Sequence, residues 1–114
     1  MEAYLTRADA GTCRLIMSWI NAGESVYMTS RKKGAKAAAE LEKALVESFP
    51  IELVLPEPSN ILAAAHIKAT AKLSYADAFA LELARARHAS VLTGDPELRN
   101  ASGAEVVWIG PARP

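Results

Sequence analysis

The sequence predicts a single α/β domain in which a parallel sheet is flanked by helices. Short runs of aliphatic and β-branched residues alternate with longer, Ala-rich segments of helical periodicity, and Gly or Pro stands at several of the boundaries. Strands that alternate with helical segments are typical of parallel sheets. A length of 114 residues with 51% hydrophobic and 23% charged residues fits one domain with its own core.

Three helical segments are expected in the first half of the chain: residues 3–14, Trp19–Lys33 and residues 35–48. Ser18 can cap the second helix, because a serine side chain accepts a hydrogen bond from a first-turn N–H. Gly34 suits the end of that helix, since glycine readily adopts the left-handed conformation found there. Pro50 ends the third helix.

The second half is expected to contain two helices, at residues 60–71 and 75–88. Three strands are expected in the whole chain, at residues 51–55, 90–93 and 106–109. One apolar stripe is predicted on the last helix, formed by Ala76, Phe79, Ala80, Leu83 and Ala84. Three strands are few for a parallel sheet that is covered by helices on both faces. A central strand is therefore expected to be missing.

Composition excludes several classes of function. The 13 basic and 13 acidic residues balance, so any contact with a nucleic acid would come from a local patch or from bound metal. Cys13 is the only cysteine, which excludes an internal disulfide, a cysteine-based zinc site and a CxxC motif. The longest apolar runs, such as residues 61–65, are too short to span a membrane. The N-terminus does not resemble a signal peptide, so a cytoplasmic location is expected.

Glu24 is the first of three acidic residues whose context favours chemistry. Its helical neighbours Ile20, Tyr27 and Met28 place it on or beside an apolar, core-facing stripe. A buried charge is costly unless it is paired or coordinates a metal. The alternative is that the stripe is slightly rotated and Glu24 pairs with a Lys or Arg at its rim, for instance Arg31.

Asp77 and Asp95 also have two interpretations each. Asp77 follows Ser74 by three residues, the spacing of a capping box. Asp95 can cap a helix whose first residue is Pro96, but it also directly follows a strand, where α/β folds bind ligands. Together with Glu24, these carboxylates are hard oxygen ligands of the kind that Mg²⁺ or Mn²⁺ prefers.

Several segments resemble the PIN domain, and most closely its VapC-like toxins of type II toxin–antitoxin pairs. Residues 73–80 (LSYADAFA) and 91–97 (VLTGDPE) are similar to the C-terminal signature of that family. Residues 17–27 (MSWINAGESVY) with Arg31 resemble its second acidic segment, and residues 64–68 fit the helix before the third. The resemblance extends from about residue 4 to residue 110.

This resemblance implies a three-layer fold and Mg²⁺- or Mn²⁺-dependent endonucleolytic cleavage of RNA. By their match to the family's motifs, Glu24, Asp77 and Asp95 would be metal ligands. Thr93 matches a hydroxyl beside the last acid, where it would orient a ligand or a water molecule. The implied partners are an RNA substrate, a cognate antitoxin and a second copy of the chain, with no membrane.

The chain departs from the family at its N-terminus. Family members begin with a hydrophobic strand that ends in Asp and lies in the middle of the sheet, whereas residues 1–5 resemble the helix after it. Asp9 lies in the wrong context to replace that acid. The strands at residues 51–55 and 90–93 are expected to flank the missing strand. Besides an active ribonuclease, two alternatives stay open: an inactive PIN-like remnant that binds an antitoxin, and a true start upstream of Met1.

Overall fold

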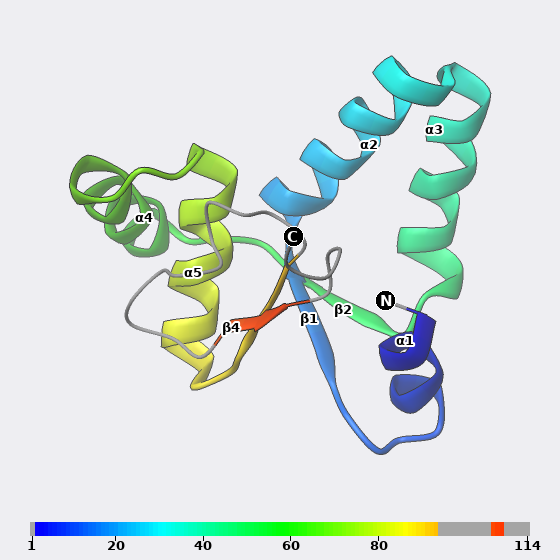
Figure 1. Cartoon of the computed structure of the whole chain (residues 1–114), viewed down its shortest axis with the longest axis horizontal. Helices are drawn as coiled ribbons and strands as arrows, with labels where there is room; N and C mark the ends of the chain where they lie inside the picture. The colour runs from blue at the N-terminus through cyan, green and yellow to red at the C-terminus, as the bar shows by residue number, and fades with distance from the viewer. Residues whose placement is uncertain (1, 94–105, 109–114) are drawn as a thin grey trace, which may run out of the picture. The chain divides into compact units, whose positions relative to one another are not determined.

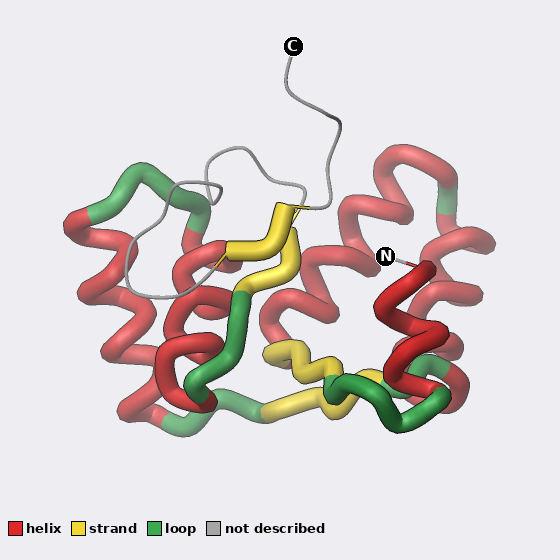
Figure 2. The backbone as a smooth tube through the Cα atoms, turned by 60° about the horizontal axis from the view of Figure 1, so that its bottom comes forward, coloured by secondary structure: helices red, strands yellow, loops and turns green. Residues whose placement is uncertain are grey.

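The computed structural model describes residues 2–93 and 106–108 (Figure 1). The chain divides into two compact units, Met1–Leu55 and Pro56–Pro114. Each unit combines helices with a pair of parallel strands, drawn in yellow in Figure 2. The predicted α/β class with parallel strands is therefore confirmed.

The first unit opens with helix α1 (Glu2–Asp9) and strand β1 (Leu15–Ser18). The helix expected over residues 3–14 thus ends early: the N–H of Gly11 donates to the carbonyl of Ala8, and Gly11 takes a φ of 77° that turns the chain. No strand was expected at β1, because four residues are too few to show a period. Its partner decides its structure.

That partner is strand β2 (Ile51–Val54), which pairs with β1 in parallel, with Leu15 opposite Ile51 and Ser18 opposite Val54. One edge of β2 is therefore occupied. Residues 51–55 were expected to flank the missing strand, but the strand observed beside them is β1. It supplies the hydrogen-bond partners from residues for which neither a helix nor a strand was predicted.

Helices α2 (Trp19–Lys33) and α3 (Ala35–Lys43) form an antiparallel hairpin, seen side by side in Figure 1. Gly34 joins them with a φ of 97°, and its N–H donates to the carbonyl of Ser30 at 3.0 Å. This confirms the predicted end of α2. Small buried residues, Ala22 and Ala38, allow the two helices to approach closely. The last turn, Ala44–Ser48, is a π-helix that leads to Pro50.

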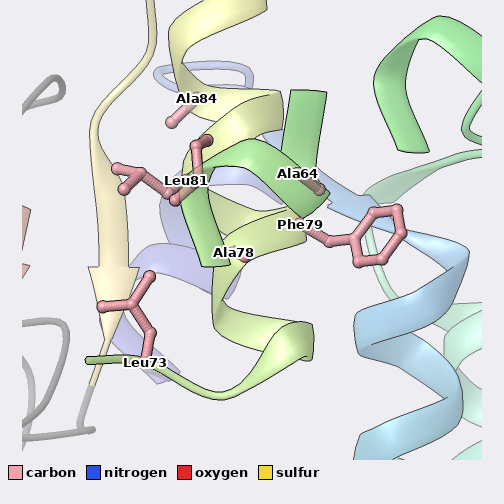
Figure 3. Close-up of a cluster of buried hydrophobic side chains, with 7 residues drawn as sticks. Ala64, Leu73, Ala78, Phe79, Leu81 and Ala84 are labelled. Atoms are coloured by element: carbon pink, nitrogen blue, oxygen red, sulfur yellow. The ribbon is translucent and has the colours of Figure 1, made fainter. Parts of the chain in front are cut away.

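The second unit contains helices α4 (Pro58–Thr70) and α5 (Tyr75–Arg87), then the parallel strands β3 (Val91–Thr93) and β4 (Val106–Trp108). Its core is an apolar cluster between α4, α5 and the loop that joins them (Figure 3). The cluster consists of Ala64, Ile67, Leu73, Ala78, Phe79, Leu81 and Ala84.

The predicted stripe on α5 is rotated in the structure. Phe79 and Ala84 are buried as expected, but Ala78 and Leu81 take the most buried positions instead of Ala80 and Leu83. The reason is that α4 and the loop before α5 cover the side of α5 on which Ala78 lies, and sequence periodicity alone does not show which neighbour a helix has.

Candidate functional site

Strand β1 ends at Ser18, which is also the N-cap of α2. The Ser18 side chain is buried, and its Oγ accepts a hydrogen bond from the N–H of Ile20 at 3.1 Å. The start of α2 thus lies at the carboxyl end of a parallel strand, where α/β folds place their ligands. Because β1 was not predicted, the sequence analysis did not place the start of α2 at the end of a strand. The run of four aliphatic and small residues before Trp19 is the sequence feature that could have indicated this strand.

Glu24 lies in the second turn of α2 and is half-buried. Its neighbours on the helix face outward: Ile20 is 39% exposed, Tyr27 51% and Met28 39%. The prediction of a core-facing stripe is therefore wrong. Helix α2 packs on α3 through its opposite side, which carries Ala22, so the larger apolar side chains point away from that contact.

The alternative interpretation of Glu24 is not observed either. Within the part of the chain that the structure describes, Glu24 and Arg31 do not form an ion pair, whereas Arg14 pairs with Glu52 at 2.9 Å. Glu24 is half-buried, and its carboxylate can accept a cation without breaking a salt bridge to Arg31.

Asp77 has a different environment at the start of α5. The backbone N–H of Asp77 donates to Ser74 Oγ at 3.1 Å, so the predicted serine cap is confirmed. Asp77 is only 7% exposed, and the residues that follow it, Ala78 and Phe79, are buried as well. The positive end of the α5 dipole favours a carboxylate here. Asp77 is therefore the most enclosed of the described candidate ligands.

Thr93 is the last residue of β3 and stands opposite Trp108 of β4. This places its backbone at the carboxyl end of a parallel strand, as expected. Asp95 lies outside the described residues. Among residues 2–93 and 106–108, no group of three or more His, Cys, Asp or Glu side chains is arranged to hold a metal ion. Since the proposed trio includes Asp95, this finding does not test it.

Glu24 belongs to the first unit and Asp77 to the second. Their convergence on one site therefore stays a prediction. The donor chemistry fits a divalent cation: the candidate ligands are all carboxylates, and hard cations such as Mg²⁺ prefer oxygen ligands.

A further acid, Glu82, was not singled out from the sequence. Its Oε2 accepts a hydrogen bond from Asn60 Nδ2 at 3.3 Å, which ties α5 to the first turn of α4. Asn60 also accepts, through Oδ1, the N–H of Glu57 at 3.0 Å. Glu82 thus has a positioning contact of its own, and the sequence carried no signal for it beyond a lone acid in a helix.

Comparison of the sequence with models of known protein families shows the family of this chain. The model of the PIN domain matches residues 2–104. The chain belongs to the PIN domain family. Glu24, Asp77, Thr93 and Asp95 all lie within the matched residues, and PIN domains are typically nucleases that use Mg²⁺ or Mn²⁺. No curated protein matches the chain. No helix in the described part of this PIN domain is both long and apolar enough to cross a membrane.

Proposed function

We propose that this PIN domain is a Mg²⁺- or Mn²⁺-dependent endoribonuclease and acts as the toxin of a VapC-like toxin–antitoxin pair. The observation that carries the proposal is Asp77. A carboxylate buried at the N-terminus of α5, within the segment 73–80 that resembles the family signature, is the environment expected of a metal ligand.

In this proposal Glu24, Asp77 and Asp95 hold the metal, and Thr93 orients a ligand or water beside the last acid. The metal, when bound, supplies an activated water and neutralises charge that develops on the phosphate. The residues of the chain do the positioning. The serine cap fixes the first turn of α5 and thereby the place of Asp77, and the Ser18 cap does the same for the helix that carries Glu24.

A second candidate function is a binding module without catalysis that holds an antitoxin. The observation that favours it is the exposure of large apolar side chains on the outer face of α2. Ile20 is 39% exposed and Tyr27 51%. Exposed apolar side chains of this kind are common at protein interaction surfaces.

Cleavage of a labelled single-stranded RNA with Mg²⁺, with Mn²⁺ and with EDTA tests the two candidates. We expect cleavage only with metal, its loss to the EDTA level in Asp77→Asn, and its retention in the control Glu42→Gln, which changes an exposed acid on α3. Induced expression should arrest growth for the parent but not for Asp77→Asn. Absence of metal-dependent cleavage by the parent would overturn the nuclease in favour of the binding module.

A further inference from the structure

The outer face of α2 carries a carboxylate, a phenol and a guanidinium group in one line, beside an isoleucine. Ile20, Glu24, Tyr27 and Arg31 follow one another at spacings of four, three and four residues, which places them on the same side of the helix. The Tyr27 side chain is 51% exposed, and Arg31 is also exposed. At about 1.5 Å per residue, Tyr27 lies about 4.5 Å along the axis from Glu24, and Arg31 about 10 Å.

A cluster of positive charge lies at the end of this line. Arg31, Lys32 and Lys33 end α2, Lys36 is in the first turn of α3, and all four are exposed. We call these four residues the basic turn. The sequence has no acidic residue between Glu24 and Glu40, although acids and bases balance in the whole chain.

The helix dipole explains only part of the basic turn. Cations at the C-terminus of α2 are favoured by its dipole, but Lys36 lies at the N-terminus of α3, where a cation is disfavoured. The first turn of α3 contains no acid to compensate. The hairpin thus brings like charges from two helix ends together at some cost in stability. A polyanion bound at this place would relieve the repulsion.

We propose that the outer face of α2 and the basic turn bind single-stranded RNA. Phosphate groups contact the basic turn, one base stacks on the Tyr27 ring, and the strand leads along α2 to Glu24. The charge favours a nucleic acid over an apolar partner, and stacking on an exposed ring needs an unpaired base. From Arg31 to Glu24 the path is about three stacked nucleotides of about 3.4 Å each. This inference rests on the proposed function, for which it names the surface that binds the RNA and the path of the strand.

Binding is measured apart from cleavage, by fluorescence anisotropy of a labelled 12-nucleotide RNA in EDTA. The triple variant Lys32→Gln, Lys33→Gln, Lys36→Gln removes most of the basic turn. The matched control Lys43→Gln, Lys68→Gln, Lys72→Gln removes the same charge from exposed lysines elsewhere. We expect the first to weaken binding about tenfold or more and to reduce the salt slope by about 2, at about 0.7 per phosphate contact. The control should change Kd less than twofold.

Tyr27→Ala tests the stacking contact, with Tyr27→Phe as the variant that keeps the ring. We expect about fivefold or weaker binding for Tyr27→Ala and unchanged binding for Tyr27→Phe, because stacking needs the ring and not its hydroxyl. All these positions are exposed, so circular dichroism should show unchanged helix content.

The outcomes separate this inference from the proposed function. A parent that binds RNA through the basic turn but cleaves nothing with metal would overturn the nuclease and leave the RNA path standing. Equal binding by the two triple variants would overturn the path, whatever the activity. Equal affinity for duplex RNA would overturn the single-strand preference. Competition by poly-glutamate as strong as that by RNA would identify the surface as one for an acidic protein segment, and would also overturn the inference.

Discussion

Helices α2 and α5 begin alike, but their predicted site acids lie in different surroundings. Each starts after a serine that accepts a first-turn N–H, and each carries a predicted site acid within its first two turns. Yet Glu24 is half-buried on an open helix face, whereas Asp77 is 7% exposed beside an apolar cluster. The difference teaches that a cap and an acid at short spacing specify a helix start, while the packing of the helix decides how enclosed the acid is.

The largest expected effect concerns the apolar side chains of the two helices. Leu81 of α5 is 1% exposed, so Leu81→Ala should lower the free energy of unfolding by about 2–5 kcal/mol, as expected for a buried leucine that leaves a cavity. Ile20 of α2 is 39% exposed, and Ile20→Ala should cost less than about 1 kcal/mol. Urea denaturation of both variants checks this. Similar losses would mean that the α2 face is covered in solution.

Metal binding provides the next comparison. A divalent ion that binds only the folded protein stabilises it by about 2.7 kcal/mol at a hundredfold excess over Kd. We expect Mn²⁺ to raise the Tm of the parent, Asp77→Asn to lose this gain, and Glu24→Gln to lose it as well if both acids share one ion. Thermal unfolding with and without Mn²⁺ measures it. A gain lost in Asp77→Asn but intact in Glu24→Gln would show that the acids do not converge.

The serine caps give the smallest effect. Ser74→Ala and Ser18→Ala each remove one acceptor of a first-turn N–H and should each cost about 1 kcal/mol of stability. Ser74→Ala should in addition weaken the Mn²⁺ effect, because it loosens the turn that holds Asp77. Chemical denaturation compares the stabilities. A normal Mn²⁺ effect in Ser74→Ala would contradict a role of the cap in positioning Asp77.

Local chemistry determined much of this protein from its sequence. The start of α2 at Trp19, its end at Gly34 and the cap of α5 by Ser74 were all predicted, because capping and left-handed glycine depend on a few neighbouring residues. The motifs around Asp77 and Asp95 pointed to the PIN domain, to which the chain belongs. These features depend on residues close together in the sequence, so they can be recognised without knowledge of the fold.

Tertiary structure alone decided the rest. Residues 15–18 become strand β1 because Ile51–Val54 lies beside them, and a run of four residues does not reveal a partner more than 30 residues away. The α2 stripe faces outward because Ala22 and not Ile20 meets α3. In both cases the sequence contains the pattern, but the free energy that selects its structure comes from contacts between distant segments, which periodicity does not encode.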